Sequence, residues 1–156
     1  MSEQLILDGP EATEAFGHKL AEALKAAPGE GMCIYLHGDL GAGKTSLARG
    51  ILRGYGHSGR VPSPTYTLVE PYNCAGRAIY HLDLYRLQNV AELEYLGIDE
   101  LALPGAVLLI EWPGQGGPDL VPPDLEIFLE ISGEGRSCRM LPRSQPGASV
   151  MAALMA

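Results

Sequence analysis

The amino-acid sequence predicts a single α/β domain with a mixed, largely parallel central sheet flanked by helices. Three observations lead to this prediction. The chain has 156 residues, a length that suits one domain with one core. Segments with helix and strand periodicity alternate along it. Two short apolar runs, 32–37 and 106–112, are typical of strands that are buried on both faces of a parallel sheet.

The N-terminal segment predicts a short strand followed by a long amphipathic helix. Residues 5–7 form the strand. Over residues 10–27 apolar side chains recur every three or four positions, which is the spacing of one helix face. Asp8 is placed to cap this helix at its start, and Pro28-Gly29 is expected to end it.

The next part of the chain predicts a strand, a helix and a hairpin. The run 32–37 leads into a glycine-rich loop, after which 45–55 has helical periodicity. Residues 56–68 have the prolines, glycines and hydroxyls of a long loop. Segments 67–73 and 77–85 are rich in β-branched and aromatic residues and are separated by a short break, which indicates an antiparallel hairpin.

The C-terminal part adds short helices and two further strands. Residues 90–102 predict one or two short helices. The alternation over 124–132 is that of a half-buried strand, and a last strand is expected at 137–141. The domain is thus predicted to span 1–142. The tail, 143–156, lacks strong periodicity and is expected to be flexible.

The charge of the chain argues against direct binding to nucleic acid. The formal net charge is −8, from 11 basic and 19 acidic residues, and the lysines are only Lys19, Lys25 and Lys44. An acidic surface repels the phosphate backbone, whose binding depends on Lys and Arg contacts. Any role on nucleic acid is therefore expected to run through a partner.

The remaining composition points to the cytoplasm. No stretch approaches the ~18 uninterrupted apolar residues of a membrane span. The N-terminus has no basic region before an apolar stretch, so no secretory signal is expected. Cys33, Cys74 and Cys138 are widely spaced and odd in number, so neither a disulfide framework, a disulfide-linked partner nor a zinc site is expected.

A phosphate-binding motif lies between the predicted strand 32–37 and the helix that follows. Residues 38–45, GDLGAGKT, match G-x-x-x-x-G-K-[ST] at every fixed position. Glycines let backbone N–H groups curl around an anion, and the helix N-terminus points its positive end at the same phosphates. The lysine places a charge on the β and γ phosphates, and the threonine hydroxyl suits magnesium. The residues expected to contact the nucleotide are Gly38, Asp39, Leu40, Gly41, Ala42, Gly43, Lys44, Thr45 and Ser46.

The fold expected around this motif is a P-loop NTPase-like domain, and ATP is the favoured nucleotide. Guanine-specific proteins of this class usually carry an Asn-Lys-x-Asp motif. The asparagines here are Asn73 and Asn89, and neither precedes a lysine.

Two acids at strand ends are candidates for the magnesium site. Glu111 ends an apolar strand and Asp83 ends the second strand of the hairpin, so both are expected at the carboxyl edge of the sheet, beside the phosphate loop. Glu111 could instead be a rim acid, and Asp83 a helix cap or a partner for Arg86. Which acid contacts magnesium directly remains open.

Two interpretations are possible for each of the other polar side chains near these segments. Residues 63–67, SPTYT, offer three aliphatic hydroxyls on a loop that could fold over a γ-phosphate, or could simply form a turn. His37 and His81 are expected to complete strand ends rather than to bind metal, because they lack the spacing of a zinc site. Trp112 either packs or senses the nucleotide or a partner.

Taken together, five segments resemble the bacterial TsaE (YjeE) family of small ATPases of tRNA threonylcarbamoyladenosine synthesis. They are HGDLGAGKTSLARG, SPTYTLVEPY, YHLDLYRL, ELEYLGIDEL and LLIEWPG, and the match runs over about 13–129. The resemblance implies ATP with magnesium as cofactors. It also implies a weak ATPase that depends on a TsaD–TsaB complex. That complex transfers threonylcarbamoyl to an adenosine beside the tRNA anticodon, so tRNA would be reached only indirectly.

The resemblance also implies roles for individual residues. Thr45 and Glu111 match the magnesium ligands, and Asp83 matches an acid important for hydrolysis. The residues expected to take part in catalysis are Lys44, Thr65, Asp83 and Glu111; those expected near the metal are Thr45, Asp83 and Glu111.

Two further positions match other nucleotide contacts of the family. Thr13 matches an early threonine that contacts the nucleotide, and Arg136 is a candidate for a late polar contact near the base. Gly114 departs from the family, in which an acid commonly follows the proline of LLIEWPG.

Two other functions share the phosphate loop. A small-molecule kinase usually adds an arginine-rich lid, and the arginines here are scattered along the chain. In a nucleotide-gated binding protein, ATP would set the conformation and hydrolysis would be incidental.

Overall fold

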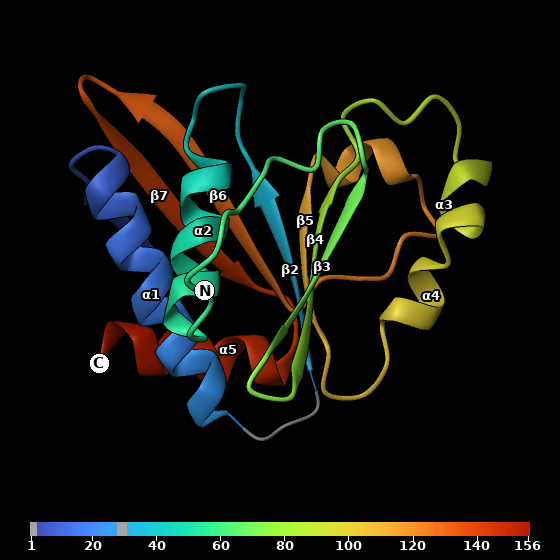
Figure 1. Cartoon of the computed structure of the whole chain (residues 1–156). Helices are drawn as coiled ribbons and strands as arrows, with labels where there is room; N and C mark the ends of the chain where they lie inside the picture. The colour runs from blue at the N-terminus through green and yellow to red at the C-terminus, as the bar shows by residue number, and fades with distance from the viewer. Residues whose placement is uncertain (1–2, 28–30) are drawn as a thin grey trace.

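The structure, a computed structural model that describes residues 3–27 and 31–156, contains one seven-stranded mixed sheet with helices on both faces (Figure 1). The strands are β1 (Glu3–Leu7), β2 (Met32–His37), β3 (Val69–Cys74), β4 (Arg77–Asp83), β5 (Val107–Glu111), β6 (Leu125–Ser132) and β7 (Gly135–Pro142). The helices are α1 (Pro10–Ala26), α2 (Lys44–Gly54), α3 (Ala91–Leu96), α4 (Ile98–Leu101), α5 (Gln145–Met155) and the 3-10 turn η1 (Pro113–Gly116). The predicted α/β fold is confirmed.

The centre of the sheet is parallel and its edges are antiparallel. The strand order is β1-β7-β6-β2-β5-β4-β3. Strands β6, β2, β5 and β4 run parallel to one another. At the edges, β3 pairs with β4, and β7 pairs with both β6 and β1, in antiparallel fashion. In this register Glu111 lies beside Asp83 on one side and Leu36 on the other. The carboxyl ends of β2, β4 and β5 therefore meet at one edge of the sheet.

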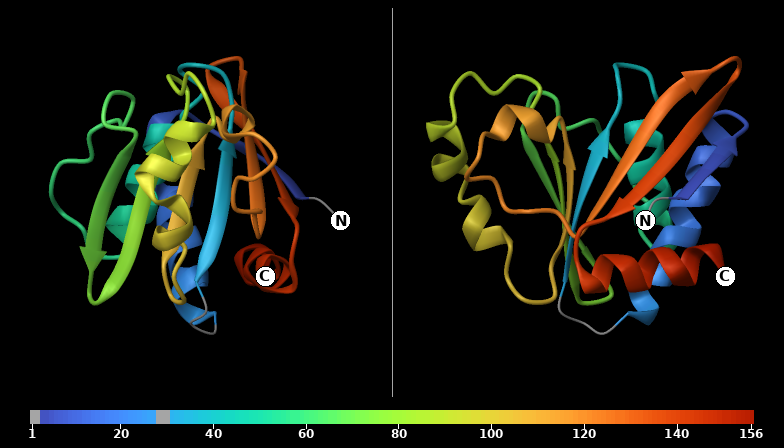
Figure 2. Two further views of the ribbon diagram at one scale, coloured as in Figure 1. Left: turned by 90° about the vertical axis from the view of Figure 1, so that its right-hand side faces the viewer. Right: turned by 180° about the vertical axis from the view of Figure 1, so that it is seen from behind.

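The two faces of the sheet carry separate hydrophobic cores. Side chains from α1, α2 and α5 pack with one face, and those from α3 and α4 cover the other face over β4 and β5 (Figure 2). Burial alternates along the strands accordingly. On β5, for example, Leu109 belongs to the first core and Leu108 to the second.

Helices α1 and α2 approach each other so closely that two glycines are required. A Cβ atom on Gly50 would lie 2.0 Å from the carbonyl oxygen of Glu14, and one on Gly17 would lie 2.5 Å from the carbonyl oxygen of Leu47. No side chain fits in either position. This contact fixes α2, whose N-terminus is part of the candidate site.

The start of α1 differs from the sequence-based expectation. The N-cap is Gly9 rather than Asp8, with no side-chain cap, and the Thr13 hydroxyl donates instead to the Gly9 carbonyl oxygen at 2.9 Å. The expected helix end at Pro28-Gly29 lies outside the described residues. The hairpin appears as predicted, as β3 and β4.

The C-terminal tail was expected to be flexible from residue 143, but α5 forms there. The Ser144 hydroxyl accepts from the backbone N–H of Gly147 at 3.1 Å and donates to Asp124 at 2.7 Å. Val150, Met151 and Leu154 are buried in the first core. The helix is short and rich in alanine, so its three anchoring residues produce only a weak periodic signal. Over residues 3–27 and 31–156, no helix has the length and apolar character needed to cross a bilayer.

Candidate nucleotide-binding site

The loop between β2 and α2 has the backbone conformation that the motif requires. Gly41 and Gly43 have φ angles of 81° and 108°, in the left-handed region that side chains disfavour. Helix α2 begins at Lys44, and its N-cap, Gly43, provides no side-chain acceptor. The N–H groups of the first turn are therefore available to an anion, and the helix dipole favours one there.

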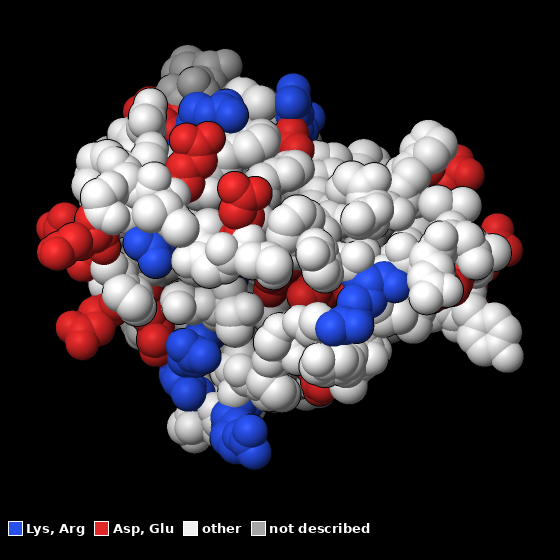
Figure 3. All heavy atoms as spheres, turned by 90° about the horizontal axis from the view of Figure 1, so that it is seen from above, with Lys and Arg blue, Asp and Glu red and all other residues white. Residues whose placement is uncertain are grey.

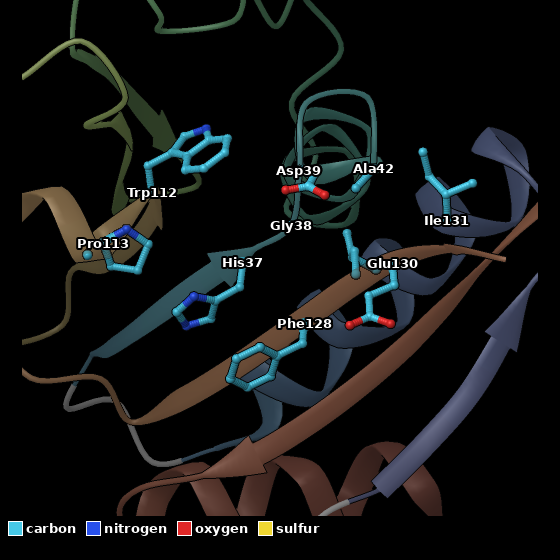
Figure 4. A pocket seen from close by; sticks show the side chains of 11 residues that line it. His37, Gly38, Asp39, Ala42, Trp112, Pro113, Phe128, Glu130 and Ile131 are labelled. Atoms are coloured by element: carbon cyan, nitrogen blue, oxygen red, sulfur yellow. The ribbon is translucent and has the colours of Figure 1, made fainter.

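A cleft of about 270 Å³ opens beside this loop and gathers most of the predicted site residues. Those it brings together are Thr13, Leu40, Gly41, Gly43, Lys44, Thr45, Ser46, Thr65, Asp83, Glu111 and Arg136. Gly38, Asp39 and Ala42 lie on the other side of the loop. They line a larger groove, of about 590 Å³, with His37, Phe128 and Trp112 (Figure 4). Trp112 borders both cavities and separates them.

Lys44 is held inside the cleft by its neighbours. Lys44 is only 5% exposed. Its ammonium group donates to the Gly38 carbonyl oxygen, and Nζ lies 3.9 Å from the centre of the Trp112 ring. Burial lowers the pKa of Lys44, and the charges of Glu111 and Asp83 act against this change. The cation is thus desolvated, which strengthens its attraction to a phosphate, while the two acids act against that attraction unless a metal ion neutralises them.

The two candidate acids lie side by side at the end of the sheet. Asp83 and Glu111 are register partners, and each is 3% exposed. Asp83 accepts from the Tyr85 backbone N–H at 2.9 Å and from the Thr65 hydroxyl at 3.2 Å. Glu111 is 2.6 Å from Nε2 of His81.

The hydroxyl-rich loop, residues 63–67, is hydrogen-bonded to Asp83. The Ser63 and Thr65 hydroxyls lie 2.8 Å apart, and Thr65 in turn donates to Asp83. The loop returns to the sheet through Leu68, which has a φ of 67° and whose carbonyl oxygen accepts from the Asp83 N–H at 3.0 Å. The loop therefore ends against the same acid that its hydroxyl contacts.

Thr13 and Arg136 border the cleft on the side of α1 and β7. The Thr13 side chain is fully buried. Arg136 donates from Nε to the carbonyl oxygen of Ala42 at 3.0 Å and from Nη2 to that of Gly41 at 3.2 Å. In this structure the guanidinium thus braces the phosphate loop; the expected contact of Arg136 with a base remains a prediction.

Two residues at the cleft have a role that the sequence does not indicate. Pro10 lines the cleft, whereas the sequence predicts only that it lies in the first turn of a helix. His81 is predicted to complete a strand end, and in the structure it contacts Glu111. The spacing puts His81 and Asp83 on the same face of β4, but only the pairing of β4 with β5 brings His81 to Glu111.

The donors in the cleft fit a magnesium ion that is shared with a nucleotide. Thr45, Asp83 and Glu111 offer the hard oxygen atoms that magnesium prefers. Among the described residues no group of three or more His, Cys, Asp or Glu side chains forms a ready metal cage. Magnesium in nucleotide sites needs none, because phosphates and water complete its shell around one or two carboxylates.

The face at the carboxyl edge of the sheet carries mixed charge. Lys and Arg side chains form small separate groups among Asp and Glu, rather than one continuous basic surface (Figure 3). This face does not have the electrostatic character of a nucleic-acid interface.

The comparisons with known proteins agree on one family. The sequence model of the family "Threonylcarbamoyl adenosine biosynthesis protein TsaE" matches residues 7–140. The tRNA threonylcarbamoyladenosine biosynthesis protein TsaE of Haemophilus influenzae is 44% identical over 139 residues, which cover 88% of each chain. The protein of the same description from Bacillus subtilis is 38% identical over 125 residues, 80% of this chain and 75% of that one.

A solved structure shares the whole fold. The crystal structure of Bacillus subtilis YdiB superposes with a TM-score of 0.80 at 28% identity, over 99% of this chain and 95% of the other. The family model and the relatives cover the phosphate loop, both strand-end acids and the hydroxyl-rich loop. The chain therefore belongs to the TsaE family of threonylcarbamoyl adenosine biosynthesis proteins.

Proposed function

We propose that this protein is a magnesium-dependent ATPase of low intrinsic activity that supports threonylcarbamoyl modification of the tRNA adenosine next to the anticodon. It would act in the cytoplasm with the TsaD–TsaB complex, which carries out the transfer itself. One observation carries the proposal. The phosphate loop, a buried lysine and two buried acids converge on a single cleft at the N-terminus of α2.

Binding would be the work of the loop and the start of α2. Backbone N–H groups at 41–46 and the Lys44 ammonium would hold the phosphates, while the Thr45 hydroxyl and Glu111 would hold magnesium. Thr13 and Arg136 also line the cleft and would flank the rest of the nucleotide. When bound, the metal ion would supply charge neutralisation for the transferred phosphoryl group.

Hydrolysis would depend on Asp83. Its carboxylate is buried beside the hydroxyl loop and could orient a water molecule towards the γ-phosphate. In this structure one of its oxygen atoms accepts from Tyr85 and the other from Thr65. Because the Thr65 hydroxyl is hydrogen-bonded to Asp83, the loop 63–67 must rearrange before this hydroxyl can contact a γ-phosphate. A requirement of this kind gives a physical reason for slow turnover without partners.

The charge of the chain supports indirect contact with tRNA. A net charge of −8 and the mixed charge of the face in Figure 3 favour a protein partner over a phosphate backbone. We therefore place tRNA on the TsaD–TsaB side of the assembly.

Phosphate release from ATP, measured with and without TsaD–TsaB, tests the proposal. We expect slow release that the complex stimulates, and that Asp83→Asn lowers in both conditions while ADP binding is retained. Unchanged hydrolysis in that variant would remove Asp83 from the reaction. Transfer of labelled phosphate to a small metabolite instead of water would favour a kinase. Nucleotide binding that supports modification without any hydrolysis would favour a nucleotide-gated binding protein.

A further inference from the structure

We propose that His81 is a positioning residue that orients the Glu111 carboxylate towards the magnesium ion of a bound nucleotide. The inference rests on the proposed function, since it assumes that Glu111 serves a metal. It adds a residue whose place in the chain indicated only the end of a strand.

The contact joins two neighbouring parallel strands. His81 on β4 is the register partner of Leu109 on β5, and Glu111 lies two residues further along β5. Residues that are diagonal neighbours on one face of a sheet are within reach when the side chains are long. Nε2 of His81 lies 2.6 Å from Oε2 of Glu111, and the two residues are 0% and 3% exposed.

The chemistry of the pair fixes its direction. An ionised carboxylate only accepts hydrogen bonds, so Nε2 is the donor. This bond uses Oε2, and Glu111 borders the nucleotide cleft. The second oxygen, Oε1, accepts no hydrogen bond within the described part of the chain and is the atom left to face a ligand. A carboxylate held by one oxygen cannot rotate freely, so the ring selects the orientation of the other.

The histidine makes no other polar contact that would explain its burial. Nδ1 is buried, and within residues 3–27 and 31–156 it has no hydrogen-bond partner. An unpaired buried polar atom lowers stability, and an apolar side chain at this position would avoid that cost. A polar ring with one satisfied nitrogen, hydrogen-bonded to an acid that lines the cleft, is consistent with a residue whose role is its single hydrogen bond.

Loss of this hydrogen bond should weaken the binding of magnesium more than the binding of ADP in the absence of magnesium. Hydrogen bonds to metal-ligating side chains orient those ligands, and their removal typically costs about 10- to 100-fold in metal affinity. We expect that effect in the magnesium dependence of ADP binding, while ADP affinity without magnesium changes by less than about threefold.

Three variants of the full-length protein separate positioning from packing. His81→Leu fills the space without a donor. His81→Asn carries an amide that is too short to reach Glu111, and His81→Gln places an amide nitrogen near the position of Nε2. The matched control is His37→Leu, which removes another His–Glu hydrogen bond, 2.8 Å long, on the opposite face of the sheet.

The measurement is ADP affinity by calorimetry across a magnesium titration, with circular dichroism and thermal melting of each variant. We expect the Leu and Asn variants to need about 10- to 100-fold more magnesium for the same ADP affinity, and the Gln variant and the control to stay close to wild type. A wild-type magnesium response in either Leu or Asn, or a Gln variant as weak as Leu, would overturn the inference. If wild-type ADP affinity itself did not respond to magnesium, the proposed function would fail instead.

Discussion

Replacement of Lys44 by methionine should weaken ATP binding about 5- to 5000-fold, and ADP binding by less, because ADP has no γ phosphate for the lysine to contact. Hydrogen bonds to charged groups contribute about 1.5–3 kcal/mol each, so contacts with two phosphates are worth about 3–6 kcal/mol. To make them, the ammonium must leave the Trp112 ring and the Gly38 carbonyl oxygen, at a cost of about 1–2 kcal/mol. The difference, about 1–5 kcal/mol, gives the stated range for ATP.

The same substitution should leave the fold intact. Burial lowers the pKa of Lys44, so the folded state disfavours its charged form relative to the unfolded chain. This penalty applies in full below the folded-state pKa and fades as pH rises from there towards the unfolded-state pKa. Methionine removes the penalty and fills a similar volume. The melting temperature without nucleotide should therefore match or exceed that of wild type.

Calorimetry with ATP and thermal melting of both proteins test this reasoning. Because Trp112 lies against the ammonium, its fluorescence should also change when wild-type protein binds ATP, and it should change less in the variant. A Lys44→Met protein that melts like wild type and binds ATP with full affinity would refute the assignment of the phosphate site.

Three further predictions concern the surroundings of the cleft. Burial raises the pKa of Glu126, but hydrogen bonds with Arg143 and His37 outweigh the effect of burial and hold that pKa below its ordinary value. The lowered pKa stabilises the fold above about pH 4.5, and this stabilisation is lost as pH falls through the folded-state pKa. Glu126→Gln should therefore cost about 1–3 kcal/mol of unfolding free energy in urea at pH 7 and much less at pH 3, and an equal loss at both would contradict this. Arg136→Met removes two hydrogen bonds to the phosphate loop and should weaken ADP binding about 5- to 30-fold by calorimetry, with the magnesium response unchanged; wild-type affinity would show that the loop needs no brace. Gly50→Ala should lower the unfolding free energy by about 1–3 kcal/mol or more, because its Cβ would meet the Glu14 carbonyl oxygen, whereas Gly114→Ala, which meets nothing within 4 Å, should be near neutral; equal melting temperatures would contradict the close helix contact.

Much of the fold follows from local patterns in the sequence. The runs of β2 and β5 are apolar because both faces of these strands are buried, and such runs are readable without a structure. Helix α5 was missed because three buried side chains on an alanine-rich segment produce little periodic contrast. The N-cap of α1 was misplaced by one residue, since Asp8 is a better cap by type but Gly9 occupies the position.

The features of the candidate site that depend on spacing along the chain could be predicted from the sequence. The features that depend on pairing between strands could not. The phosphate loop is contiguous, so its residues could be identified directly. Asp83 and Glu111 could be placed at one edge of the sheet because parallel strands share that edge. The contacts of His81 with Glu111 and of Arg136 with the loop join residues 30 and about 95 positions apart, and only the strand register brings them together.

The most direct test of the central claim is a turnover assay for tRNA modification. TsaD–TsaB, tRNA and threonylcarbamoyl-adenylate would be supplied with ATP and magnesium, and modified adenosine counted per TsaD–TsaB complex. With this protein present we predict many turnovers, falling to about one or fewer when the protein or ATP is omitted or when Lys44→Met replaces wild type. The same number of turnovers with and without the protein would contradict the account.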